Sequence, residues 1–262
     1  MWSAASEEYK RQGQTNGLAG EDINATEIWD DYRGEGVIIS IVDDGLDHEH
    51  PDIEDNYEPT YSYDWCNDDS DPAPSDWNGH GTAAAGVAAA TGNNSLYVSG
   101  AAWEATLAGS TLIACWASDS TEADALSFEN DNIDIYSNSW GPSDDGSTLE
   151  GPGPLTLAAF EEDAYWGRGG LGNSITWAAG NGLGSDDNAN KDGYANSRFT
   201  IAVTAITHEG DQSYYAEPGA NILCLLYTYD ASDHTPQLHL YCCSILYKKN
   251  LTIVLARMSI AT

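Results

Sequence analysis

The chain has 262 residues, enough for one domain with a sizeable core, and its 41% hydrophobic content with nine Trp excludes a disordered protein. Its 42 acidic and 9 basic residues give a formal net charge of −33, which repels nucleic acid phosphates and anionic membranes and argues against nucleic acid as a partner. Such a charge attracts cationic partners or metal ions, although a surface adapted to solubility or high salt has the same composition. No apolar run of about 18 residues predicts a membrane span, and the polar segment Met1–Asn16 has no apolar core of a secretory signal.

The pattern of strands alternating with helices predicts an open parallel α/β sheet with right-handed crossovers. In chain order we expect a helix at Asn24–Tyr32, a strand at Val37–Val42, a helix at His80–Ala90, strands at Ala105–Cys115 and Ile133–Ser137, a helix at Pro154–Trp166, and strands at Ser174–Ala179 and Phe199–Ile206. In the helix 154–166, Leu157, Phe160 and Ala164 share one face.

A composition break divides the chain near residue 218. Residues 219–262 hold 2 of the 42 acidic and 3 of the 9 basic residues, which leaves a net charge of −34 for residues 1–218 against +1 for the tail. The tail also holds Cys224, Cys242 and Cys243. Five cysteines without regular spacing predict neither a disulfide framework nor a zinc site, and they leave the redox compartment open.

Asp43 and Ser137–Trp140 fall where active groups are expected in such a sheet, beyond the carboxyl ends of strands. Asp43 follows the strand 37–42, His80 opens an alanine-rich helix between Gly79 and Gly81, and Asn181 follows the strand 174–179. Each feature alone also fits an ordinary acidic or glycine-rich turn or a structural histidine.

Their combination and order are more specific than any one of them. The sequences Ile41–Leu46 (IVDDGL), Asn78–Thr82 (NGHGT), Ile135–Pro142 (IYSNSWGP), Gly169–Gly172 (GGLG), Ala178–Gly182 (AAGNG) and Asp192–Ser197 (DGYANS) resemble the kexin/furin branch of the subtilisin-like serine proteases. The resemblance runs nearly without gaps from Gly20 to Glu217. It implies a peptidase domain at residues 20–218, an unmatched segment at 1–19, and a tail at 219–262 that does not resemble the family.

The resemblance implies Ser-His-Asp acyl transfer. Asp43 would orient His80, His80 would act as general base and then general acid, and Asn181 would donate a hydrogen bond to the oxyanion. Secretory-pathway or extracellular location is implied by the family in the same way.

The resemblance also implies acidic pockets that bind paired basic residues of peptide or proprotein substrates. Asp144 and Asp192 would bind the residue before the scissile bond, and Asp44 the residue before that. Trp140, Glu122, Glu150 and Tyr194 complete the implied substrate site, and Trp77 stands where relatives have a further acid. The alternative for these acids is a solvated surface, which is common in so acidic a chain.

Calcium is the implied cofactor, since hard cations bind clusters of oxygen ligands. One implied site uses Asp52 and Asn94 with backbone carbonyls near Thr91, Leu96 and Val98. The other uses Asp144, Asp187 and Glu217.

The nucleophile that the resemblance implies has no match in these residues. Ser232, Ser244 and Ser259 lack the Gly-Thr lead-in and the following helix of small residues. We therefore expect a fold that is incomplete at its C-terminus, with a tail that derives from read-through or frame-shifted sequence. Two functions remain open: a calcium-dependent kexin-type endopeptidase that lacks its serine here, and a non-catalytic calcium-binding module that binds basic peptides.

Overall fold

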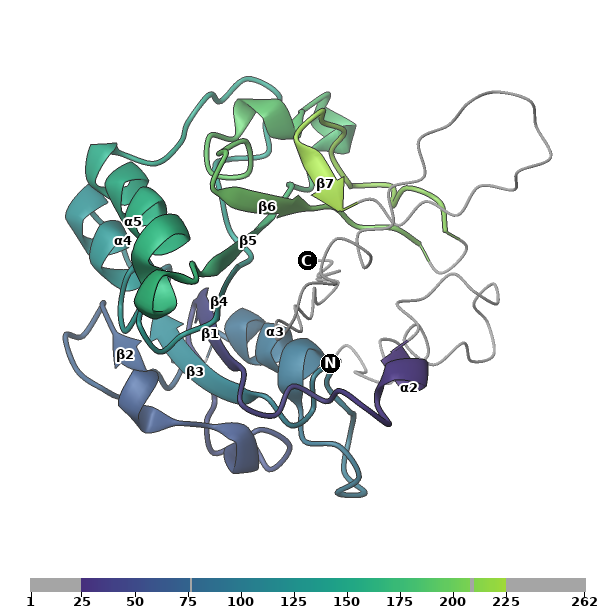
Figure 1. Ribbon diagram of the computed structural model, residues 1–262. Coiled ribbons are helices and arrows are strands. Elements are labelled where there is room, and N and C mark those ends of the chain that lie inside the picture. The colour runs from purple at the N-terminus through teal and green to yellow at the C-terminus, as the bar shows by residue number, and fades with distance from the viewer. Residues whose placement is uncertain (1–24, 76, 208–209, 225–262) are drawn as a thin grey trace.

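The computed structural model describes residues 25–75, 77–207 and 210–224 (Figure 1). Within them, a seven-stranded parallel sheet has the order β2-β3-β1-β4-β5-β6-β7. Its strands are β1 (Ile38–Asp43), β2 (Tyr63–Asp64), β3 (Thr106–Thr111), β4 (Ile135–Asn138), β5 (Ser174–Ala178), β6 (Thr200–Val203) and β7 (Ile222–Cys224). Between β3 and β4 the chain crosses from one side of β1 to the other. Such a switch point leaves a crevice at the carboxyl ends of the strands.

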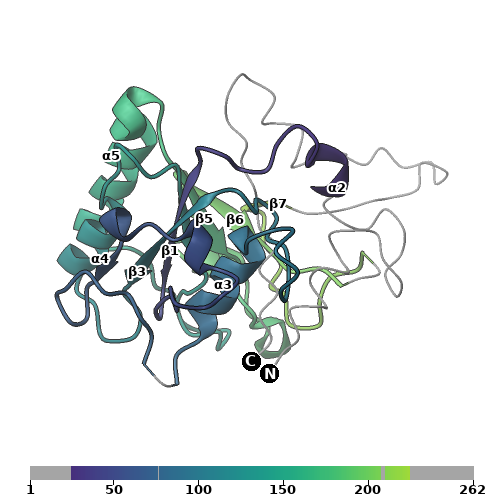
Figure 2. The same cartoon turned by 90° about the horizontal axis from the view of Figure 1, so that it is seen from below.

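Helices cover both faces of this sheet (Figures 1 and 2). α3 (His80–Ala89) lies on one face, where Ala85 and Ala89 pack against Ile41 and Leu107. α4 (Asp119–Leu126) and α5 (Pro154–Gly170) lie on the other, where Leu126 and Phe160 share a core with Val42. The remaining helices are short: α2 (Ala25–Ile28) and the 3-10 helices η1 (Glu54–Asn56), η2 (Pro59–Tyr61), η3 (Leu183–Ser185) and η4 (Ala189–Lys191).

The predicted parallel α/β sheet is confirmed, and several local expectations are corrected. The helix expected at 24–32 is a single turn, α2, and the strand expected at 105–115 ends at Thr111. In α5, Leu157 is 42% exposed, because the buried stripe runs through Thr156, Phe160 and Asp163. The two-residue strand β2, the short helix α4 and the strand β7 were not predicted.

The cysteine spacing left the disulfide pairing open, and the structure shows one pair. Cys66, just after β2, forms a disulfide with Cys115, in the loop after β3, with the two Cα atoms 5.7 Å apart. The disulfide forms because β2 and β3 are neighbours in the sheet, so the spacing of the cysteines in the sequence does not predict it. Cys242, Cys243 and the rest of the predicted tail beyond residue 224, including the serines named above, lie outside the described residues, as does the segment 1–19.

Candidate active site

The buried carboxylate of Asp43 pairs with the half-buried imidazole of His80 at the carboxyl edge of the sheet. Asp43 is the last residue of β1 and is fully buried, and His80 is the first residue of α3. The His80 Nδ1 lies 2.8 Å from Asp43 Oδ1 and 3.0 Å from Asp43 Oδ2. A proton on Nδ1 is held by this carboxylate, so Nε2 is left to act as a base.

The pair shifts the acid–base properties of both groups. Burial raises the pKa of the Asp43 carboxyl, and the hydrogen bond and charge of His80 counteract that rise. For His80, burial lowers the pKa, but the hydrogen bond and charge of Asp43, with the charge of Asp44, raise it above its usual value. The imidazolium form of His80 is therefore favoured by its surroundings.

Helix α3 approaches the end of β1 very closely. A Cβ atom at Gly81 would lie 2.3 Å from the Gly45 carbonyl oxygen and 2.8 Å from Asp43 Cβ, so only glycine fits there. Gly79, before the helix, offers no side-chain cap. Asp44 takes that role, because its carboxylate accepts hydrogen bonds from the amides of His80 (3.2 Å) and Gly81 (2.8 Å).

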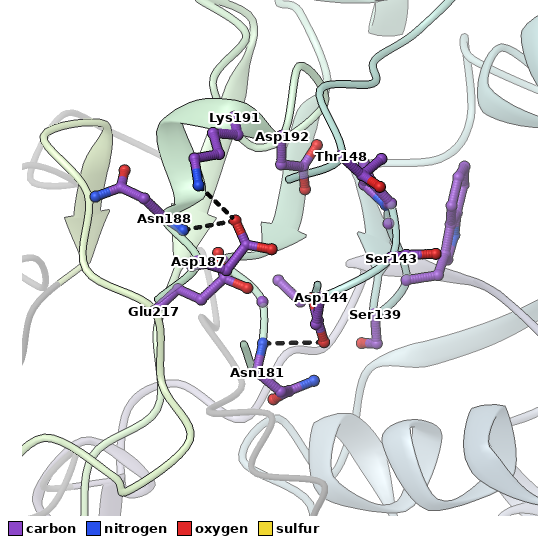
Figure 3. A pocket seen from close by; sticks show the side chains of 16 residues that line it. Ser139, Ser143, Asp144, Thr148, Asn181, Asp187, Asn188, Lys191, Asp192 and Glu217 are labelled. Carbon is purple, nitrogen blue, oxygen red and sulfur yellow. Dashed lines mark hydrogen bonds and ion pairs between the residues drawn. The ribbon is translucent and has the colours of Figure 1, made fainter. Parts of the chain in front are cut away.

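A pocket of about 220 Å³ opens beside the ends of β4 and β5. It is lined by Ser139, Trp140, Gly141, Pro142, Ser143, Asp144, Thr148, Ala178, Ala179, Gly180, Asn181, Asp187, Asn188, Lys191, Asp192 and Glu217. The backbone amide of Asn181 donates a hydrogen bond to Asp144 Oδ2 at 3.3 Å (Figure 3). Asn181 itself is exposed. Asn181, the predicted oxyanion donor, therefore lines the same pocket as the carboxylates of Asp144, Asp187, Asp192 and Glu217.

Three of these acidic residues pack around the backbone of Gly182. A Cβ atom there would lie 2.7 Å from Asp187 Cβ, 2.8 Å from Glu217 Oε1 and 3.1 Å from Asp144 Cβ. Burial, followed by the charges of Asp187 and Asp144, raises the pKa of Glu217 to about 7. Burial also opposes the charge on Asp187, but the amides of Gly146 and Asn188 and the charge of Lys191 lower its pKa overall.

The fourth carboxylate, Asp192, is held by the backbone. Its Oδ1 accepts the amides of Tyr194 (2.7 Å) and Ala195 (3.2 Å). Its Oδ2 faces Gly141, where an added Cβ would lie 3.0 Å away. Burial, the largest effect, raises the pKa of Asp192 to about 6.

Comparison with known proteins identifies this arrangement. A model of the subtilase family of S8 peptidases matches residues 34–237, more than half of the chain. The chain belongs to the subtilase family. The match ends beyond the predicted boundary at 218, and that boundary stays a prediction.

Curated relatives support the kexin/furin branch. The subtilase chain is 44% identical over 214 residues to furin-like protease 1, isoform 1-CRR, of Drosophila melanogaster, covering 80% of this chain and 19% of that protein. It is 41% identical over 218 residues to proprotein convertase subtilisin/kexin type 4 of Rattus norvegicus, covering 81% and 32%. The chain thus spans less than a third of the length of these two relatives.

A solved structure agrees with the fold. The crystal structure of the Aeromonas sobria serine protease aligns with a TM-score of 0.69 and 26% identity, covering 83% of this chain and 41% of that one.

The other predicted substrate residues of the subtilase form one aromatic and acidic wall. Glu122, on α4, accepts a hydrogen bond from the Tyr194 hydroxyl at 2.9 Å, and burial raises the pKa of Glu122. The Tyr194 ring stacks on Trp177, and Trp140 contacts both rings edge-on. Glu150 pairs with Asp192 through a strand-like bridge. Trp77 is 95% exposed, so it contributes little to the packing of the fold.

The residues predicted for the first calcium site also lie together. Asp52 is buried, and its carboxylate accepts hydrogen bonds from the Asn94 carboxamide (2.7 Å) and the Val98 amide (2.9 Å). The Leu96 amide binds Asn94 Oδ1, and the Thr91 amide binds the Asp52 carbonyl. The Thr91 hydroxyl is buried without a hydrogen-bond partner.

Both sets have the oxygen-rich chemistry that calcium prefers. In the described part of the chain, however, no three His, Cys, Asp or Glu side chains already stand as ligands of one metal ion. Like-charged carboxylates repel one another, and a cation bound between Asp144, Asp187 and Glu217 would relieve that repulsion. Because Gly182 has no side chain, these three residues can pack closely around its backbone.

Sequence reasoning missed four residues that line the pocket, Ser143, Thr148, Asn188 and Lys191, of which only Lys191 carries a charge. Its Nζ lies 2.6 Å from the Gly146 carbonyl oxygen and 3.5 Å from Asp187 Oδ1. Lys191 directly precedes Asp192, which was predicted as a pocket residue, and this position in the sequence could have indicated its role. Within the described residues, no helix is both long and apolar enough to cross a membrane.

Proposed function

We propose that this subtilase domain is the acid–base and substrate-binding part of a kexin-type serine endopeptidase, which cleaves proprotein substrates after paired basic residues. The observation that carries the proposal is the contact of His80 with the buried carboxylate of Asp43 at the carboxyl edge of the sheet, beside a pocket lined by Asp144, Asp187, Asp192 and Glu217.

In this proposal His80 Nε2 takes the proton from the attacking hydroxyl and later gives it to the leaving amine. Asp43 keeps the proton of His80 on Nδ1 and stabilises the imidazolium. The carboxamide of Asn181, an exposed residue, donates to the oxygen on which negative charge develops. The described residues present all three of these side chains, whereas the attacking hydroxyl belongs to the nucleophile that has no match in this sequence.

The acidic pocket supports selectivity for basic side chains. Asp192 Oδ1 is fixed by two amides, which leaves Oδ2 to bind a guanidinium or ammonium group. A carboxylate–guanidinium pair about 4 Å apart is worth about 4 kcal/mol at an effective dielectric of 20, before desolvation is counted. Asp144, whose carboxylate lies 3.3 Å from the Asn181 amide nitrogen, would add to the attraction for a basic side chain.

Calcium is part of the same proposal. Asp144, Asp187 and Glu217 would hold one ion, and Asp52 and Asn94 with carbonyls near Thr91, Leu96 and Val98 would hold another. When bound, calcium would supply positive charge that neutralises these carboxylates and joins their loops.

The 262 residues contain no Gly-Thr-Ser sequence, which favours a second candidate for the chain as it stands: a module that binds basic peptides without cleaving them. In subtilisin itself, loss of the serine lowers turnover about 10⁶-fold. We also infer the secretory pathway as the location, and the Cys66–Cys115 disulfide supports an oxidising compartment.

Titration of the full chain with two peptides, one containing Arg-Arg and one with Gln-Gln in its place, tests the proposal by calorimetry. We expect the Arg-Arg peptide to bind at least about tenfold more tightly. Asp192→Asn should reduce the difference several-fold, because it removes one of the acids proposed to bind the paired basic residues. Asp186→Asn is the matched control, because Asp186 is exposed and has a φ of 57°, a conformation that Asn tolerates. Equal binding of both peptides by the unmodified chain would contradict basic specificity, and cleavage would contradict the non-catalytic candidate.

A further inference from the structure

Lys191 is the single lysine among the described residues, and it lies in the pocket that holds the carboxylate cluster (Figure 3). It ends η4 and its side chain is 36% exposed. In a chain with 42 acidic and 9 basic residues, few carboxylates have a cationic neighbour. Asp187, which is 6% exposed, is one that does.

Lys191 joins the two walls of the pocket. Its Nζ donates to the Gly146 carbonyl at 2.6 Å, and the Gly146 amide in turn donates to Asp187 Oδ2 at 2.8 Å. The ion pair between Lys191 and Asp187 closes the ring. The loop 143–148, which carries Asp144, is thereby tied to the loop that carries Asp187 and Asp192.

A metal ion held by Asp144, Asp187 and Glu217 would make the same two kinds of contact. It would neutralise Asp187 and would bridge these two loops. Lys191 already does both in part, but it supplies one positive charge to a cluster of four carboxylates. Its ammonium group and a divalent ion that share Asp187 also repel each other.

We propose that Lys191 is an internal cation of this cluster, which holds the pocket walls together without calcium and weakens calcium binding there. The inference rests on the proposed calcium site. It concerns only what Lys191 does to that site, so the two can fail separately.

Calcium titration of the full chain by calorimetry, after treatment with chelator, tests this directly. Asp144→Asn identifies which binding step belongs to the pocket, as the step that it removes. Lys191→Gln removes the charge but keeps an N–H donor for Gly146, and we expect it to lower the Kd of that step about tenfold. Lys191→Arg keeps the charge and should leave the Kd within about twofold of the unmodified chain.

Arg198→Gln is the matched control for net charge. Arg198 lies over the ring of Phe199, outside the pocket lining, and its loss should not change the Kd. A second readout is thermal stability: in chelator Lys191→Gln should melt at a lower temperature than the unmodified chain, and saturating calcium should remove most of the difference.

Each outcome decides a different point. An unchanged Kd in Lys191→Gln, with the pocket step still present, overturns the role of Lys191 and leaves the calcium site standing. A titration in which Asp144→Asn removes no step ends the proposed site, and the inference with it. If Lys191→Gln fails to fold even in saturating calcium, calcium cannot replace Lys191, and the proposal is likewise overturned. Tighter binding in Arg198→Gln of equal size would show a net-charge effect instead.

Discussion

The carboxylate of Asp44 accepts a hydrogen bond from the backbone amide of His80, at 3.2 Å, in addition to that from Gly81 at 2.8 Å. Two adjacent acids at the end of β1 therefore hold the same residue by different groups: Asp43 holds the imidazole and Asp44 the backbone. The resemblance to kexin/furin proteases assigns Asp44 to substrate binding, and the structure gives it a task in positioning α3 as well.

Asp44→Ala should lower the free energy of unfolding by about 1–2 kcal/mol, because it removes the only cap of the first α3 amides that the structure shows among its described residues. It should also lower the pKa of His80, since the charge of Asp44 helps to raise it. Urea denaturation and NMR titration of His80 measure the two effects. Glu35→Ala, at an exposed acid, should change neither.

The Asp43–His80 pair should make stability depend on pH in a defined direction. The pKa of His80 is raised in the fold, so its contribution is fully present below its unfolded pKa of about 6.5 and is lost as pH rises through the folded pKa. Asp43→Asn should lower the pKa of His80, as NMR would detect. An unchanged titration would mean that the pair does not form in solution, whereas Asp71→Asn, at an exposed acid paired with His48, serves as the control.

Asp163→Asn should stabilise the protein at pH 8 and have little effect at pH 4. Asp163 is fully buried on α5, and burial, its largest cause, raises its pKa to about 7. As pH rises from the unfolded pKa of about 4 to the folded pKa of about 7, the carboxyl ionises in the unfolded chain first and stability is lost, whereas the neutral amide loses none. The gain at pH 8 should therefore be on the order of 4 kcal/mol. Denaturation at both pH values measures it, with exposed Glu162→Gln for comparison. A larger gain at pH 4 would refute this explanation.

Removal of the Cys66–Cys115 disulfide should lower the free energy of unfolding by about 4 kcal/mol, because the bond closes a long loop in the unfolded chain. The double variant Cys66→Ala/Cys115→Ala should show this in guanidinium denaturation. A reducing agent should destabilise the unmodified chain by a similar amount and have no such effect on the double variant. Two free thiols at these positions in the oxidised protein would refute the pairing.

Much of the site follows from local sequence. The β-branched run that ends at Asp43 predicts a buried parallel strand, and the glycines around His80 predict a helix that starts in a crowded place. Both patterns are properties of consecutive residues. The ends of the predicted strand and helix therefore lie within one residue of the ends of β1 and α3. The family likeness then joined Asp43, His80 and Asn181 into one hypothesis.

Only the tertiary structure decided how distant segments meet. The cap that Asp44 supplies to α3, the disulfide between Cys66 and Cys115, and the ring of Lys191, Gly146 and Asp187 each join loops that are far apart in the chain. Hydrogen bonds, ion pairs and disulfides depend on distances of a few ångströms, which are set by the order and register of the strands. The sequence determined which chemical groups this protein carries to the edge of its sheet, and the fold determined which of them touch.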